Sequence, residues 1–153
     1  MFKKVVVALD GSERSNAALE QVESVADRAD GVITVVHVRE LWGGRGAGPV
    51  HLDEPNRIRV VHESAEALRA HGFKVNEETH TTYRRPAGVI LQVARQANAD
   101  VIVTGLAKHR SLIGAAVGST PHALVHRANC PVLVAPSAPA KRRSAAADPA
   151  LAA

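Results

Sequence analysis

The stretch from Gly105 to Thr120 holds the residues whose types and spacing best suit ligand chemistry. It reads GLAKHRSLIGAAVGST and leads from an apolar run into a segment of helical period. A helix N-terminus presents unpaired N–H groups and a partial positive charge, which suit a phosphate. Gly118 lets a phosphate approach the backbone, and Ser119 and Thr120 add hydroxyl donors. Positive charge comes from Lys108, His109 and Arg110. The arrangement predicts a phosphate site; the alternative is that Ser119 only caps the helix.

The elements that must position this stretch alternate between short apolar runs and segments of helical period. This alternation is typical of βαβ units and a parallel sheet. Strands are expected at residues 3–9, 32–38, 73–81, 100–105 and 131–135, with 73–81 as a half-exposed edge strand. About five strands with four crossovers predict an α/β fold, a single open doubly wound parallel sheet with helices on both faces.

The buried faces of the intervening helices follow from apolar residues three or four positions apart. The expected inward residues are Ala18, Val22, Val25, Ala26 and Ala29 in the first helix, Ile58, Val61, Ala65 and Leu68 in the second, and Ile90, Val93, Ala94 and Ala97 in the third. Ser12 is placed to cap the first helix, Pro86 opens the third, and the fourth spans residues 118–128.

Ligands in doubly wound sheets bind beyond the carboxyl ends of the strands, where the strand order switches. Three residues stand at the expected strand ends: Asp10, Val38 and Gly105. They are therefore candidate binding residues, together with the phosphate stretch. For Asp10 the alternative is a helix cap or an Asx-turn.

Several motifs in this order resemble the universal stress protein family. Gly105 followed by Gly118-Ser119 is similar to the family's G-x2-G-x9-G-S/T signature. Further matches are VVVALDGS at 5–12, His37-Val38, Pro86-Ala87, ADVIVTG at 99–105 and NCPVLV at 129–134. The resemblance covers nearly the whole folded chain, and the motifs are specific as a set.

The resemblance implies the strand order 3-2-1-4-5 and an adenine nucleotide, ATP with or without Mg²⁺, as the ligand. Asp10 and Val38 would hold the ribose and the adenine, while Gly105, Gly118 and Ser119 would hold the ribose and the phosphates. A carboxylate can accept hydrogen bonds from ribose hydroxyls, and the Val38 backbone can pair with adenine. The resemblance also implies a homodimer in which the last strand, Val132–Ala135, pairs across the two-fold axis; its apolar edge would otherwise be exposed.

One residue departs from the family pattern, because Lys108 replaces the signature's second glycine. Where a positive φ or close backbone approach is needed, a lysine costs about 1 kcal/mol or more. Its ammonium group could instead contact a phosphate directly. The family includes members that lack the full signature and bind no ATP, so a scaffold or dimerisation module without nucleotide stays open as an alternative.

Enzyme chemistry finds little support in the sequence. The segment DGSERS at 10–15 stands where related ATP-using enzymes carry a Ser-Gly-Gly pyrophosphate loop, but the paired glycines are missing and no HIGH-type motif follows. We expect no catalytic residues and at most slow ATP hydrolysis. An adenylylating enzyme is the remaining alternative.

Length and composition limit the number of domains, the kinds of partner and the cellular location that we expect. The 153 residues predict one domain over 1–136 and a disordered, basic, Ala/Pro-rich tail over 137–153. The net charge is +4, and part of it lies in the tail, which carries Lys141, Arg142 and Arg143 against Asp148. No aromatic-interleaved basic stretch occurs elsewhere in the sequence. Nucleic acid is therefore not an expected partner. No apolar run is long enough for a membrane span, and the protein is expected to be cytoplasmic.

A few single residues invite sharper hypotheses. His122 and His126 are four apart on an expected helix, but no third ligand is evident, so a metal site is not expected. Cys130, the single cysteine, is expected to pack as a small hydrophobe without catalysis. Trp42 lies in a Gly-rich loop over 41–56 and could cover a ligand or a partner.

Overall fold

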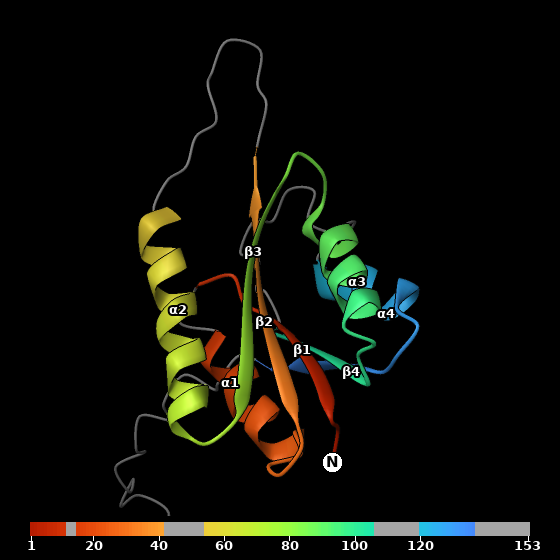
Figure 1. The fold of residues 1–153 in the computed structure, drawn as a ribbon. Coiled ribbons are helices and arrows are strands. Elements are labelled where there is room, and N and C mark those ends of the chain that lie inside the picture. The colour runs from red at the N-terminus through yellow and green to blue at the C-terminus, as the bar shows by residue number, and fades with distance from the viewer. Residues whose placement is uncertain (12–14, 42–53, 106–119, 137–153) are drawn as a thin grey trace, which may run out of the picture.

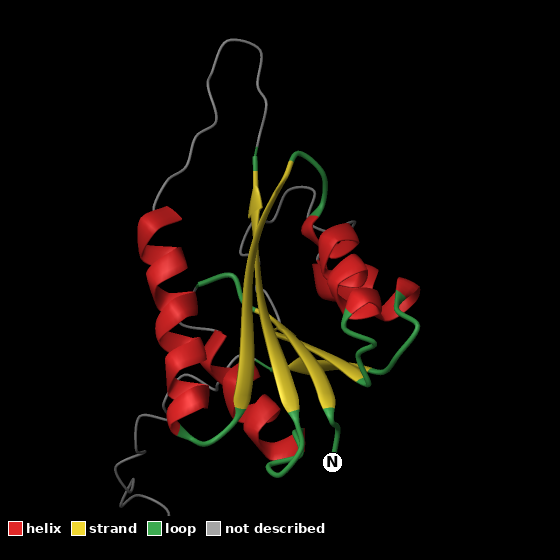
Figure 2. Cartoon of the chain, viewed as in Figure 1, coloured by secondary structure: helices red, strands yellow, loops and turns green. Residues whose placement is uncertain are grey.

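The fold is one parallel sheet between two layers of helices (Figures 1 and 2). The computed structural model describes residues 1–11, 15–41, 54–105 and 120–136. The elements are β1 (Lys4–Ala8), α1 (Ser15–Val25), β2 (Val32–Glu40), α2 (Glu54–Ala70), β3 (Lys74–Thr82), α3 (Pro86–Gln96), β4 (Val101–Gly105), α4 (Thr120–Arg127) and β5 (Val132–Ala135). The five strands are ordered β3-β2-β1-β4-β5, which confirms the predicted fold class and strand order.

Each face of the sheet has its own core. Alternate side chains of a strand point to opposite faces, so Val5 and Val7 pack with α1 and α2, whereas Val6 packs with α3 and α4. All three are at most 1% exposed. A strand covered on both faces has no polar side to present, which explains its unbroken run of valines.

Two expected inward positions are wrong. Ala29 is exposed because α1 ends at Val25, after which the Asp27 N–H donates to the carbonyl of Phe2 at 2.8 Å instead of continuing the helix. Ile58 is 36% exposed on the first turns of α2. Apolar residues therefore continue at helical spacing beyond Val25, although tertiary hydrogen bonds end α1 there.

Two element boundaries also differ from expectation. β2 continues two residues beyond Val38 because Arg39 and Glu40 pair with β3. α2 already begins at Glu54, inside the segment expected to be loop. The predicted edge strand is confirmed, since β3 pairs on one side only and its side chains are exposed or half-buried.

Asp100 fixes the amino ends of β1 and β4 against each other. Its Oδ2 accepts hydrogen bonds from the backbone N–H groups of Lys3 at 3.0 Å and Lys4 at 2.8 Å. Its own N–H donates to the Lys4 carbonyl at 2.7 Å. A carboxylate that accepts two backbone donors makes strong charge-assisted bonds. This contact sets the register that brings the carboxyl ends of β1 and β4 level.

The turn after α1 contains a carboxylate whose ionisation should couple folding to pH. Asp27 Oδ1 accepts from the N–H groups of Ala29 at 2.9 Å and Asp30 at 3.0 Å. The Asp30 and then the Ala29 hydrogen bond lower the pKa of the Asp27 carboxyl, because both favour its ionised form. This stabilisation is present above the ordinary aspartate pKa and is lost as the pH falls through the lowered folded value.

We therefore expect Asp27→Asn to reduce the loss of stability that acid causes. Urea unfolding at a series of pH values from neutral to strongly acidic would measure this, with the variant and the wild type converging at the acid end. Asp30→Asn is the control, because its exposed ion pair with Lys3 at 3.5 Å is worth little. Parallel acid profiles for the wild type and Asp27→Asn would contradict the prediction.

Candidate functional site

The candidate site begins where β1 and β4 end side by side. Ala8, the last residue of β1, is in register with Thr104, so the following residue on each strand, Leu9 and Gly105, stand level. Asp10 then extends past the edge of the sheet and is exposed. The chain crosses from β1 to β2 through α1 on one face and from β3 to β4 through α3 on the other (Figure 1). The strand order therefore switches between β1 and β4, which is where such sheets bind ligands.

The backbone N–H and carbonyl of Val38 also belong to this site. The carbonyl of Val36 accepts from the Leu9 N–H at 3.0 Å, so the backbone groups of Val36 point toward β1. Backbone groups two residues apart on a strand point to the same neighbour, so those of Val38 point the same way, but past the last residue of β1. The Val38 side chain packs partly buried against the core under α3 and α4. The backbone rather than the side chain of Val38 thus faces the site.

The turn after Asp10 lies tightly against the start of α2. Gly11 has a φ of +70°, and a Cβ added there would lie 2.6 Å from the Cα of Arg57. Arg57 Nη1 donates to the carbonyl of Asp10 at 3.0 Å. Only a glycine fits both this backbone conformation and this spacing. Arg57 therefore holds the chain at Asp10 in place and brings a cation to the rim of the site.

His37 supports the same turn from inside the molecule. Its side chain is 3% exposed, and its Nδ1 lies 2.9 Å from the carbonyl oxygen of Leu9. Because a carbonyl only accepts, Nδ1 carries the proton in this contact. The bond links β2 to the end of β1, one residue before Asp10.

Arg57 and His37 are positioning residues that the sequence patterns did not single out for this role. Each acts on a residue far away in the chain, 47 positions for Arg57 and 28 for His37. The positive φ of Gly11 is the part that sequence could have flagged, because a Gly after an Asp is typical of turns.

The phosphate side of the site is described only at its two ends. Gly105 ends β4 and Thr120, half-buried, begins α4. Gly118, Ser119 and Lys108 lie outside the described residues, as do Ser12 and Trp42. The structure thus places Asp10, Val38 and Gly105 at one strand edge, while the predicted cradle itself falls outside the described part.

His122 and His126 both lie exposed on α4, with ring centroids 4.5 Å apart. Within the described part of the chain, no group of three or more His, Cys, Asp or Glu residues could hold a metal ion. The histidine pair therefore stays without a third protein ligand among those residues.

Cys130 belongs to a different region of the molecule. It is half-buried, and burial, followed by the Asp100 carboxylate, raises the pKa of its thiol. It lines a surface pocket of about 220 Å³ with residues from the end of α3, including Arg95 and Asn98. This pocket lies near the start of β4, at the opposite end of the strand from Gly105. A raised pKa lowers the fraction of thiolate, which is the nucleophilic form of a cysteine.

Comparison with protein families identifies close resemblances over almost the whole described chain. The model of the universal stress protein family matches residues 1–136. Universal stress protein A homolog 1 of Coxiella burnetii is 29% identical over 137 residues, covering 86% of this chain and 94% of the relative. A universal stress protein of Thermus aquaticus is 30% identical over 141 residues, covering 88% and 98%.

Solved structures share the fold. A universal stress protein in complex with cAMP superposes with a TM-score of 0.67 at 20% identity, covering 89% of this chain and 98% of that one. The universal stress protein from Archaeoglobus fulgidus in complex with dAMP has a TM-score of 0.58 at 21% identity, covering 86% and 96%. Among the described helices, none has the length and apolar character that crossing a membrane requires.

Proposed function

The chain belongs to the universal stress protein family, and on this premise we propose that it is a cytoplasmic, ATP-binding regulatory module of the stress response. The observation that carries the proposal is the meeting of three groups at one strand edge. These are the exposed Asp10, the backbone of Val38, which points past the end of β1, and the end of β4 at Gly105. Two proteins of the same fold are described as complexes with cAMP and dAMP, and this supports an adenine nucleotide as the ligand.

Each part of ATP has a matching group. The Val38 N–H and carbonyl can pair with the edge of adenine, and the Asp10 carboxylate can accept from the ribose hydroxyls. The phosphates then extend past Gly105 toward the start of α4, where Gly118, Ser119 and Thr120 follow one another in the sequence. Arg57, which holds the Asp10 carbonyl, adds a cation to the opposite rim. When Mg²⁺ accompanies the nucleotide, it neutralises part of the phosphate charge.

Regulation rather than catalysis is the role proposed for the bound nucleotide. No general base or Walker-type Mg²⁺ residue is recognisable in the sequence, so any hydrolysis is expected to be slow. β5 is the natural dimer edge: it lies at the end of the sheet, and Val132, Leu133 and Val134 are only partly buried. A nucleotide bound between β1 and β4 lies two strands from this edge and can bias the surface that a partner protein binds.

Titration calorimetry with ATP, with and without Mg²⁺, tests the proposal. The wild type should bind ATP, and Asp10→Ala should weaken binding by about ten- to a hundredfold, because a hydrogen bond to a charged group is worth about 1.5–3 kcal/mol. Gly118→Val should abolish it by filling the space a phosphate needs. Asp30→Asn, which removes a surface carboxylate at the other end of β1, should bind like the wild type.

The remaining alternatives appear as other outcomes of the same experiment. A folded protein without ATP binding would identify the module as a scaffold that has lost its nucleotide, as Lys108 at a signature glycine allows. Release of AMP or pyrophosphate on incubation with ATP and candidate acceptors would identify an adenylylating enzyme. Either result would overturn the proposed function.

A further inference from the structure

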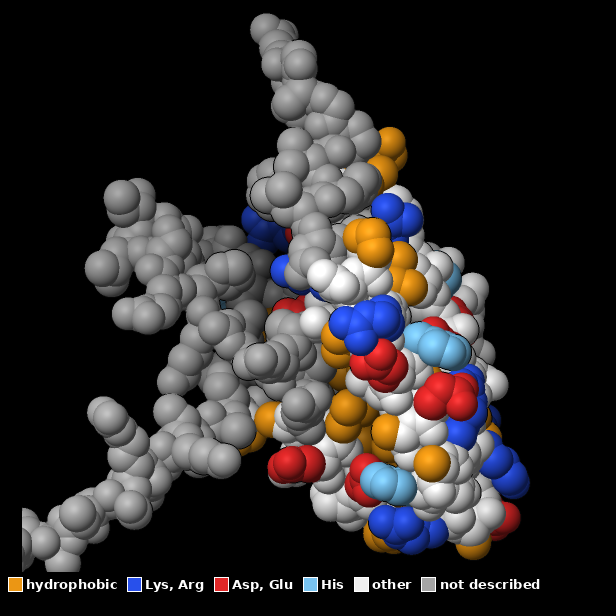
Figure 3. All heavy atoms as spheres, turned by 90° about the vertical axis from the view of Figure 1, so that its left-hand side faces the viewer, with side chains coloured by type: hydrophobic (Ala, Val, Ile, Leu, Met, Phe, Trp, Pro, Cys, Tyr) orange, Lys and Arg blue, Asp and Glu red, His pale blue; other side chains and the backbone are white. Residues whose placement is uncertain are grey.

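The two helical layers come from parts of the chain that differ in charge. Among the described residues, those up to 82 include eleven Asp and Glu against eight Lys and Arg, whereas those from 83 to 136 include one against four. α1 and α2 come from the first part, and α3 and α4 from the second. On the α1 and α2 side, acidic and basic side chains alternate over the surface (Figure 3). The fold thus turns a difference along the chain into a difference between faces.

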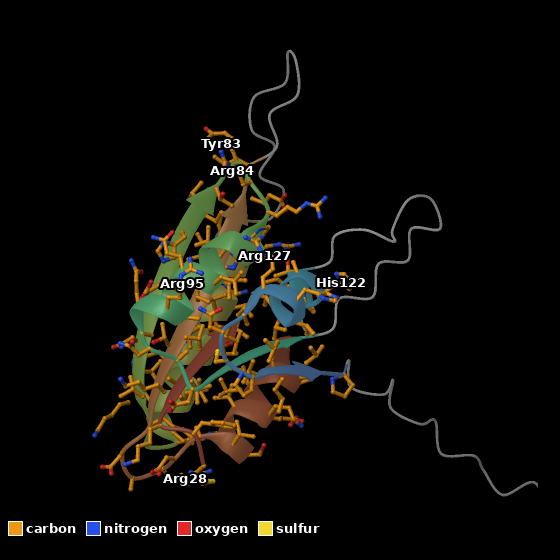
Figure 4. The ribbon with its side chains drawn as sticks, turned by 90° about the vertical axis from the view of Figure 1, so that its right-hand side faces the viewer. Arg28, Tyr83, Arg84, Arg95, His122 and Arg127 are labelled. Atoms are coloured by element: carbon orange, nitrogen blue, oxygen red, sulfur yellow. The ribbon has the colours of Figure 1, made fainter. Side chains whose placement is uncertain are left out.

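We define the α3–α4 face as Tyr83, Arg84, Arg95, His122 and Arg127. All five are exposed, and Figure 4 shows Arg95, Arg127 and His122 at α3 and α4, with Tyr83 and Arg84 above them, after the end of β3. They come from two segments that are distant in sequence and that the packing of α3 on α4 brings onto one side.

The arginines of this face are available to a ligand. Within the described residues, Arg84, Arg95 and Arg127 form no ion pair. By contrast, three arginines outside this face each pair with a glutamate: Arg28 with Glu23, Arg59 with Glu63, and Arg69 with Glu66.

Of the carboxylates on this side of the sheet, Glu40, in register with Thr82 beside Tyr83, is exposed and has no ion pair with another described residue, whereas two others are engaged. Asp100 accepts from the N–H groups of Lys3 and Lys4, and Glu78 on β3 contacts His80 at 2.8 Å. Because the three arginines form no ion pair with a described residue, they can bind an external anion, and the guanidinium fork binds phosphate in a bidentate manner.

Exposed rings distinguish the kind of anion. Tyr83 is 77% exposed next to Arg84, and the His122 ring lies 4.5 Å from that of His126. Binding of an acidic polypeptide does not require an exposed aromatic ring. The bases of a single-stranded nucleic acid, by contrast, stack on such rings while arginines bind its backbone. We propose that the α3–α4 face binds single-stranded nucleic acid, with the arginines on the phosphates and Tyr83 as a stacking surface.

This proposal is independent of the nucleotide site, and it differs from the expectation from the sequence that nucleic acid is not a partner. That expectation rested on the lack of basic and aromatic residues interleaved in one stretch. The face is assembled from two separate stretches, so a search along the chain could not find it.

The test is fluorescence anisotropy of a labelled single-stranded RNA oligonucleotide of mixed sequence with the full chain. The triple variant Arg84→Gln, Arg95→Gln, Arg127→Gln should bind at least tenfold more weakly at low salt. Its slope of log affinity against log salt should be smaller by about two, since each lost phosphate contact lowers the slope by about 0.7. Tyr83→Ala should weaken binding severalfold, and Tyr83→Phe should restore it.

The matched control removes the same charge elsewhere. Arg28→Gln, Arg59→Gln, Arg69→Gln changes the net charge equally and should bind RNA nearly like the wild type, with thermal unfolding confirming that both triple variants are folded. Asp10→Ala should leave RNA binding unchanged, which separates this proposal from the ATP site. Equal losses in both triple variants, or no RNA binding by the wild type, would overturn the proposal. Binding of poly-glutamate as tight as that of RNA, with no effect of Tyr83→Ala, would assign the face to an acidic protein instead.

Discussion

Gly11→Ala is expected to weaken ATP binding about tenfold or more and to lower the free energy of unfolding by roughly 2–4 kcal/mol. The φ of +70° alone makes an L side chain unfavourable there. The added Cβ would also lie 2.6 Å from the Arg57 Cα and 2.7 Å from its carbonyl oxygen. The turn or the start of α2 must shift, and with it the Asp10 carbonyl that Arg57 holds at 3.0 Å. Calorimetry with ATP and urea unfolding would measure the two effects.

Two other glycines separate the causes. Gly72 has a φ of +91° but no atom within 4 Å of an added Cβ, so Gly72→Ala should cost only the backbone strain, about 1–2 kcal/mol. Gly88 lies in α3 with no atom nearby, and Gly88→Ala should raise stability by about 0.5–1 kcal/mol. Neither should change ATP affinity. If Gly11→Ala binds ATP as tightly as Gly72→Ala does, the contact with Arg57 does not position the site.

Leu124→Ala is expected to cost about 2–5 kcal/mol of unfolding free energy. Leu124 is 0% exposed and belongs to the buried cluster that also holds Val6, Ile90 and Ile102. α4 has only eight residues, of which Pro121 and Leu124 are buried, so this side chain supplies much of its attachment to the sheet. A helix this short is not stable by itself. The variant should therefore also weaken ATP binding, since α4 begins at the phosphate side of the proposed site.

The adjacent position supplies the control. Val125 is 55% exposed on the same helix, and Val125→Ala should change stability by less than about 0.5 kcal/mol. Urea unfolding followed by far-UV circular dichroism would compare the three proteins, all at one concentration because a dimer's stability depends on it. A loss in Leu124→Ala no larger than that in Val125→Ala would show that α4 is not anchored by this residue.

Most of the fold was predictable because burial leaves a local imprint on the sequence. The valine run of β1 and the apolar run of β4 indicated strands covered on both faces, and helical spacing indicated the layers between them. The same local reasoning was wrong at Ala29, where a hydrogen bond from Asp27 to Phe2 ends α1 although the apolar spacing continues. Helix ends are decided by partners, and those partners can be distant in the chain.

The candidate site was predictable to the extent that its residues end strands. Asp10 and Gly105 follow directly from where apolar runs stop, and parallel strands bring their carboxyl ends to one edge of the sheet. Val38 was placed near the right edge, but β2 continues to Glu40, since β3 extends alongside it.

The sequence by itself determined most of the buried positions and the strands they form, because period and composition act over a few residues at a time. Only the tertiary structure decided that Arg57 holds Asp10, that His37 supports Leu9, and that the arginines of α3 and α4 share a face. Those juxtapositions depend on strand register and helix packing, which join positions tens of residues apart and leave no periodic trace along the chain.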